Sequence, residues 1–304
     1  MLSSTGIRRE HMKIPYQGRY WYFLSGLIVA CSGARSFPPG APSPQPASSV
    51  PQPTVPVEPT AAASSFKYAT GTISYRISRS AAIETTGLDA QTHREISTNI
   101  THELLTLEPT DLATNFTALI DTSTTTTQGL IGSVESVQLP VRISGSFTDS
   151  AFTINADAGG SKCNTSSSML VTDLHNLLVP FPERLSTGVS WRDSVNIQGC
   201  QAGIPTSGHT DRSYTVSGDA SYEGHPVLVI LRTDTTHAKG EGGLQQHRVS
   251  IDATGTGTAL YYLDTATGRV ARLTIDQMLD LSVTASARRS QFKQSSKQEF
   301  QIVP

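Results

Sequence analysis

The sequence predicts a mainly β fold: an antiparallel meander sheet, curved into a half-barrel or divided into two layers, with one short helix in mid-domain. The first observation is the alternation of apolar and polar residues in long runs, the longest of which contains Leu273, Ile275, Leu279, Leu281 and Val283. Such a run gives a strand one apolar and one polar face, as in an antiparallel sheet covered on one side. The second observation is that tight-turn sequences, such as Glu223-Gly224 and 264–268, separate the runs.

The other strands follow from shorter patterns. Alternating residues predict strands at 73–77 and 137–143. The segment 94–107 is ambiguous, because its apolar residues recur every four positions, as in a helix, while its threonines favour a strand. Closely spaced glycines predict a further turn, at Gly240, Gly242 and Gly243.

One helix is expected, at 169–178. Ser166–Ser168 offer hydroxyls for its N-cap, and Pro180 ends the run. Asp173 is expected near the start of the helix, where a negative charge suits the helix dipole. The apolar residues between these signals share one helical face: Met169, Leu170, Leu174, Leu177 and Leu178. This face is expected to pack on the concave side of the sheet.

The chain divides into three parts. Residues 1–30 are expected to be a signal peptide, 31–65 a lipidated cysteine and a Pro-rich disordered tether, and 66–304 a single β-rich domain. Nine of the 17 prolines lie between 37 and 64, a segment with one charged residue, Glu58. Such a segment buries too little apolar surface to offset the entropy of folding.

The signal peptide is recognised by its charge and length. Basic residues precede an apolar run at 20–30, which as a helix would span about 16 Å, roughly half of a bilayer's hydrocarbon core. That length is too short for a transmembrane helix and is typical of a secretory signal. Both Met1 and Met12 remain possible starts. The basic residues are Arg8, Arg9, Lys13 and Arg19.

The run ends in Ile28-Val29-Ala30-Cys31, which resembles the lipobox of bacterial lipoproteins. The resemblance implies that the thiol of Cys31 receives a diacylglycerol, with acyl chains such as palmitate that anchor the protein in a membrane of the bacterial cell envelope. Ser32, standing where an aspartate would argue for inner-membrane retention, favours the outer membrane. The alternative is an ordinary secretory signal followed by a chance cysteine.

Composition limits the partners. Charged residues make up 16% of the chain and the formal net charge is −2, so the protein has no broad positive field to hold a polyanion. We therefore expect no nucleic-acid partner, and contact with a membrane only through the lipid anchor. The two cysteines that remain, Cys163 and Cys200, are expected to form a disulfide in an oxidising compartment. A metal or redox pair is the alternative, but it lacks the close CxxC spacing.

Motifs for catalysis are absent from the sequence. It contains no GxSxG, GxGxxG, GxxxxGK[ST] or HExxH. His209 and Asp211 lie near Ser207, but three such residues in one turn indicate an exposed loop rather than a catalytic triad. We therefore expect a protein that is not an enzyme and that uses no cofactor or metal.

As a whole, the lipobox, the tether and the helix-interrupted meander resemble bacterial envelope lipoproteins. Among these, the lipoprotein-carrier and mycobacterial lipid-carrier families have half-barrels that wrap an apolar cavity. The resemblance implies a non-enzymatic module that binds a lipid or acyl chain between sheet and helix. The alternative is a surface-displayed structural or protein-interaction lipoprotein with a filled core and an unknown protein partner. The candidate lining residues, which would fill the core in that case, are Leu174, Leu178, Phe181 and Trp191.

Overall fold

The computed structural model describes residues 66–69, 71–86, 95–111, 115–128, 139–147, 152–155, 165–201, 204–244, 247–285 and 288–303. The expected signal peptide, Cys31 and the tether lie outside these ranges, and so does Cys163. The described part contains no helix that is long and apolar enough to cross a membrane.

The strands of the described part form one antiparallel sheet of eleven strands, in the order β5-β4-β3-β2-β1-β11-β10-β9-β8-β7-β6. Consecutive strands pair with each other, except β5 and β6, which form the two edges of the sheet, and β1 pairs with β11, so the predicted meander is confirmed. The strands are β1 (Ile73–Thr86), β2 (Glu95–Asp111), β3 (Asn115–Gln128), β4 (Val141–Phe147), β5 (Phe152–Asn155), β6 (Ser190–Gln201), β7 (Ile204–Tyr222), β8 (His225–Leu244), β9 (His247–Asp264), β10 (Arg269–Ala285) and β11 (Arg288–Val303).

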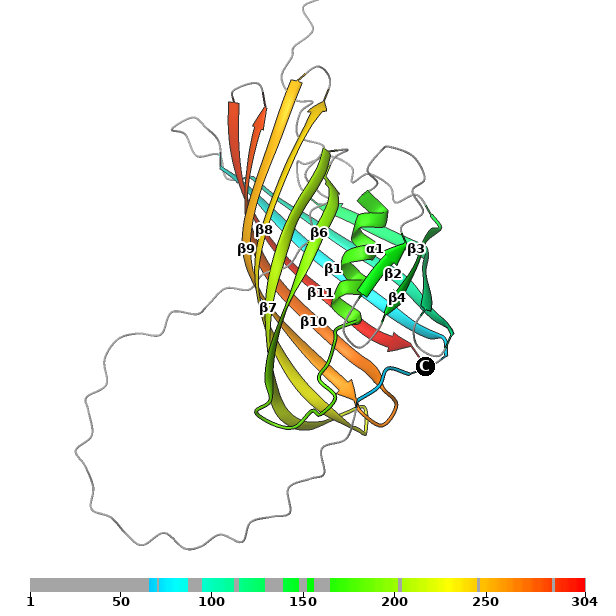
Figure 1. Cartoon of the computed structure of the whole chain (residues 1–304). Coiled ribbons are helices and arrows are strands. Elements are labelled where there is room, and N and C mark those ends of the chain that lie inside the picture. The colour runs from blue at the N-terminus through cyan, green and yellow to red at the C-terminus, as the bar shows by residue number, and fades with distance from the viewer. Residues whose placement is uncertain are drawn as a thin grey trace, which may run out of the picture.

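The sheet is curved and open, and the helix α1 (Thr165–Leu177) lies on its concave side (Figure 1). α1 packs against β4 and β6, close to the two free edges of the sheet. It begins four residues earlier than expected, so Ser166–Ser168 lie inside its first turns. The segment 94–107 belongs to a strand, β2, as its threonines favoured.

Two of the predicted turns are confirmed. Glu223 and Gly224 connect β7 to β8 with positive φ angles of 50° and 83°, as a tight two-residue hairpin turn requires. Asp264 closes the β9–β10 turn, where its Oδ1 accepts hydrogen bonds from the backbone N–H of Ala266 at 2.9 Å and of Thr267 at 3.1 Å.

The glycine turn was a wrong prediction, because Gly240, Gly242 and Gly243 lie inside β8. Gly240 instead allows β8 and β7 to approach each other closely. A Cβ atom at this position would come within 2.7 Å of the carbonyl oxygen of Pro205 on β7. The sequence does not distinguish a glycine needed for such an approach from a glycine needed for a turn.

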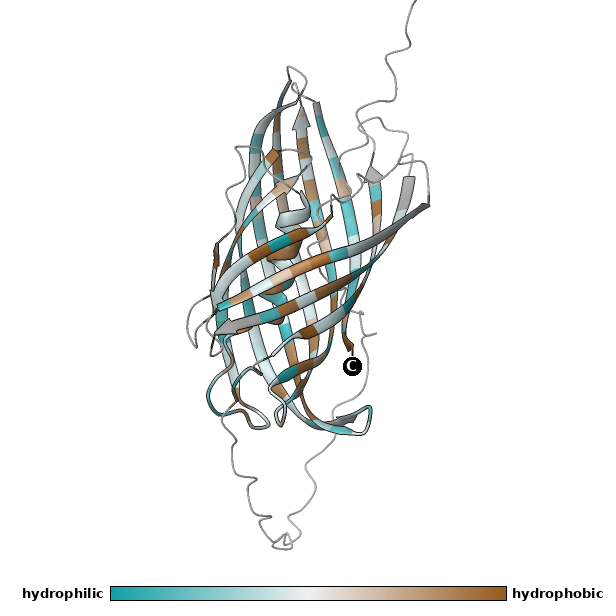
Figure 2. Ribbon diagram, turned by 90° about the vertical axis from the view of Figure 1, so that its right-hand side faces the viewer, coloured by the Kyte–Doolittle hydropathy of each residue, from teal (hydrophilic) through white to brown (hydrophobic). Residues whose placement is uncertain are grey.

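Three zones follow one another along the concave face. The largest is the helix-covered core, which joins α1 to residues near the middle or one end of most strands, including Ile77, Leu105, Tyr261 and Leu273. A belt of buried polar side chains comes next. Beyond it lies a second apolar region made of strand residues, which we call the distal apolar zone: Ile83, Ile204, Val249, Ile251, Ala253, Leu279, Leu281 and Phe292. Hydrophobic and hydrophilic residues alternate along the strands in Figure 2.

Candidate functional site

Three arginines from three strands point into the concave face beside α1: Arg79 of β1, Arg212 of β7 and Arg232 of β8. They are only 1–5% exposed. Each lies two residues from a buried apolar or aromatic residue of the same strand, Ile77, Tyr214 and Ile230, and faces the same way. A buried charge is costly unless it is paired. We call the buried polar residues around them the polar belt: Arg79, Glu103, Arg212, Arg232, Asp234, Gln277 and Gln298.

Arg79 joins the sheet to the helix. Its Nη1 donates to Glu103 of β2, and its Nη2 donates to Asp173 of α1. Gln298 of β11 donates to the other oxygen of Asp173 at 2.7 Å, and Ser123 of β3 donates to Glu103 at 3.1 Å. One positive charge therefore faces two buried carboxyl groups.

The prediction that Asp173 lies near the start of the helix, beside the positive end of its dipole, is wrong, because α1 begins at Thr165. Asp173 lies in the second half of α1 and is 2% exposed. Burial raises its pKa to about 6, against the lowering effect of Arg79 and with a further increase from Glu103. Through these bonds to Arg79 and Gln298, the Asp173 side chain connects α1 to β1 and β11, in the middle of the sheet.

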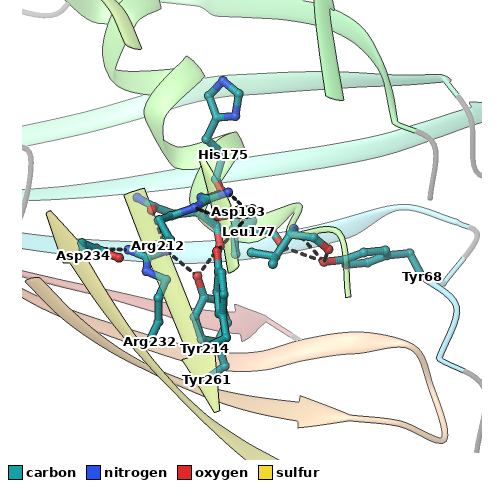
Figure 3. A network of polar contacts seen from close by, with 11 residues as sticks. Tyr68, His175, Leu177, Asp193, Arg212, Tyr214, Arg232, Asp234 and Tyr261 are labelled. Carbon is teal, nitrogen blue, oxygen red and sulfur yellow. Dashed lines mark hydrogen bonds and ion pairs between the residues drawn. The ribbon is translucent and has the colours of Figure 1, made fainter. Parts of the chain in front are cut away.

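Arg232 makes a second connection (Figure 3). Its Nη2 donates to Asp234 at 2.8 Å, and its Nη1 donates to the side-chain oxygen of Asn176 at 3.0 Å. Nη1 also donates to the hydroxyl of Tyr261 at 2.5 Å, and the guanidinium lies 5.6 Å from the centre of that ring. This arrangement compensates the charge of Arg232 and fixes the last turn of α1.

Most carbonyls at the C-terminal end of α1, which have no partner inside the helix, are bound by side chains from the sheet or by the segment after the helix. Leu178 N donates to Leu174 O at 2.8 Å, and Arg212 donates to His175 O at 2.7 Å. The Tyr261 hydroxyl donates to Asn176 O at 3.0 Å. The Tyr68 hydroxyl lies 3.2 Å from Leu177 O. Arg212 itself is held by Asp193 of β6, through bonds of 2.7 and 2.5 Å.

We expect Tyr68→Phe to lower the free energy of unfolding by about 1–2 kcal/mol. The Tyr68 hydroxyl donates to Val179 O and accepts from Val179 N, each at 2.9 Å, so its loss leaves backbone groups behind α1 unpaired. Urea unfolding of the full chain measures the change. Tyr262→Phe, on the outer face of β9, is the control, and an equal loss in both variants would contradict the role of Tyr68.

A cavity of about 40 Å³ lies between α1 and strands β6, β7, β8 and β10. Its lining includes three polar atoms that are buried and have no hydrogen-bond partner in the described part: Arg232 Nε, Asp234 Oδ1 and Gln277 Oε1. This volume holds about three water molecules, not a lipid or a metabolite. The cavity can therefore take only a very small polar guest.

The ionisable groups of this cavity do not form an acid–base pair. Asp234 forms an ion pair with Arg232, so its carboxylate is not free to act as a base. Burial lowers the pKa of His175 to about 4, with a further decrease from Arg212, so the imidazole is neutral at pH 7. Their geometry supports a structural role in holding α1 to the sheet.

The four predicted lining residues do lie together, but in the helix-covered core. Leu174 and Leu178 are 0% and 7% exposed, while Phe181 and Trp191 are partly buried against the same cluster. Phe181 packs edge-on against Trp191 with 5.9 Å between ring centres. None of the four lines the cavity.

Two other sequence predictions have different outcomes. His209 and Asp211 lie on a strand, β7, so the predicted loop is wrong, although both side chains are exposed. Cys200 is buried at the end of β6. Because Cys163 lies outside the described residues, the Cys163–Cys200 disulfide stays a prediction, as does the lipidation of Cys31.

Comparison with known proteins assigns no family to the chain. No family model matches the sequence, and no curated protein matches it significantly.

Proposed function

We propose that the folded body is a non-enzymatic binding module for an apolar ligand, a lipid or acyl chain, in an exported lipoprotein anchored at the cell envelope through Cys31. The ligand would lie along the distal apolar zone, and not under α1 as the sequence indicated. The supporting observation is that the apolar concave face extends beyond the helix. No residue of α1 belongs to either cluster of the distal apolar zone.

The polar belt gives this location a chemical basis. It separates the helix-covered core from the distal apolar zone, so an acyl chain in that zone would end at buried arginine and amide groups. Such an arrangement suits an amphipathic molecule, with an apolar body and a polar end that accepts hydrogen bonds.

The competing function is that of a structural or protein-interaction lipoprotein with a solid core. It is favoured by the packing of Leu174 and Leu178 beneath α1. The side chains of the distal apolar zone are also only 1–6% exposed, so a ligand has to open that zone in order to enter it.

A photoreactive fatty acid distinguishes these functions. Cells producing the full chain are fed the fatty acid and irradiated, and the labelled peptides are located by mass spectrometry. The proposal expects light-dependent label at 249–253, 279–283 or 292. Label confined to 170–191 would place the ligand under α1, and no label above that of a urea-unfolded chain would favour the solid core. Label on Cys31 that does not depend on light reports lipidation itself.

A pair of variants tests the location. We expect Leu281→Gln, which places an amide in the distal apolar zone, to reduce the labelling several-fold. Leu231→Gln is the control, because Leu231 lies on β8 with 42% of its surface exposed. If Leu281→Gln does not fold, judged by circular dichroism, Val283→Gln at the margin of the same zone replaces it. Equal labelling of the parent and the folded variant would contradict the proposed location.

A further inference from the structure

Two histidines form a pair on the outer face of the sheet, away from the polar belt. His209 of β7 and His237 of β8 are directly opposite each other in the antiparallel register. Their ring centres are 5.5 Å apart and the rings are tilted by 33°. Their strand neighbours Thr210 and Thr236 are buried, so strand alternation turns both imidazoles outward, toward solvent.

The charges around the pair are favourable for a cation. Asp211, two residues along β7 on the same face, places Oδ2 3.8 Å from His209 Nε2. Lys239, two residues beyond His237, is 3.7 Å from the carboxylate of Asp252, which offsets its charge. The side chains of His209 and Asp211 are 50% and 63% exposed, so a hydrated ion reaches them without any change in the core.

We propose that His209 and His237 bind one divalent transition-metal cation, with Cu²⁺ and Zn²⁺ as the best candidates. Imidazole nitrogen suits these ions, and Cu²⁺ binds most strongly of the divalent first-row metals. At a metal–nitrogen distance of about 2.0–2.1 Å, two nitrogens on one tetrahedral ion are about 3.3 Å apart. Side-chain rotation brings opposed imidazoles to that separation, while the strand backbones hold the pair in place.

The site has two protein ligands, and water completes the coordination of the ion. No group of three or more histidine, cysteine, aspartate or glutamate residues suited to a metal exists in the described part. Asp211 therefore contributes its charge next to His209.

Copper titration of the full chain, purified without a histidine tag, tests the site. We expect the electron paramagnetic resonance spectrum of one bound Cu²⁺ to show two nitrogen ligands. His209→Gln and His237→Gln should each lose this signal and bind Cu²⁺ at least about tenfold more weakly, because either change removes the second, pre-positioned ligand.

His225→Gln is the matched control, because His225 is also exposed on β8 but faces Tyr222 rather than a histidine. It should bind Cu²⁺ as the parent does, and all three variants should keep the parent's melting temperature. Parent-like binding by either His209→Gln or His237→Gln, or an equal loss in His225→Gln, would overturn the proposal. This result does not depend on whether the chain binds a lipid.

Discussion

Replacement of Arg79 by methionine should lower the free energy of unfolding by about 3–5 kcal/mol, the range typical of breaking a buried ion pair. Arg79 is 2% exposed and is the positive partner of both Glu103 and Asp173. Without it, two carboxyl groups remain buried near each other. The shape of the side chain is largely kept, so the loss comes from the missing charge and hydrogen bonds.

Urea unfolding of the full chain at about pH 7 measures this effect. Arg76→Met is the matched control, since Arg76 lies on the exposed face of the same strand, and surface changes of this kind alter stability by about 0.5 kcal/mol or less. The triple variant Arg79→Met/Glu103→Gln/Asp173→Asn should recover part of the loss, because it removes the unpaired charges. A loss in Arg79→Met no larger than in Arg76→Met would show that the cluster does not hold α1.

The sheet could be predicted because its signals are local. Leu273, Ile275 and Leu279 alternate within one strand, and the Glu223-Gly224 turn lies between two neighbouring strands. The pairing of β1 with β11 joins the two ends of the folded part, and no pattern within either strand predicts it. This pairing places β11 in the middle of the sheet. Lys293 and Lys297 of β11 lie opposite Asp280 and Asp276 of β10.

The candidate site was harder to predict for the same reason. Arg79 and Arg232 break the apolar alternation of their strands, and this signal is visible in the sequence. Their partners are not, because Asp173 lies 94 residues beyond Arg79 and on a helix. Leu170, Leu174 and Leu177 of the predicted apolar face are buried on α1, but the same face also buries Asp173 and Asn176. Whether Leu174 borders a cavity or fills a core depends on how side chains from distant strands pack, which no local pattern encodes.

Two groups on α1 should give the stability opposite dependences on pH. The pKa of Asp173 is raised from 3.8 to about 6. The stabilisation of the folded state that comes from this raised pKa is therefore fully present below about pH 4 and is lost as the pH rises through 6. The pKa of His175 is lowered from 6.5 to about 4, so its contribution is present above about pH 6.5 and is lost as the pH falls through 4. Each pKa shift corresponds to a change of about 3 kcal/mol in the free energy of unfolding.

In the parent chain these two contributions largely cancel between about pH 4 and pH 6, and single variants should separate them. Asp173→Asn removes the first contribution, so the stability of the parent relative to this variant should fall by about 3 kcal/mol across that range. His175→Gln should give the opposite slope. The neighbouring charged groups, Glu103 and Arg79 beside Asp173 and Asp193 and Arg212 beside His175, are present in both proteins of each comparison. Urea unfolding at several pH values measures both differences. If the Asp173→Asn difference does not change with pH, the carboxyl group of Asp173 is not buried against Arg79, and α1 does not sit on the sheet in the way described above.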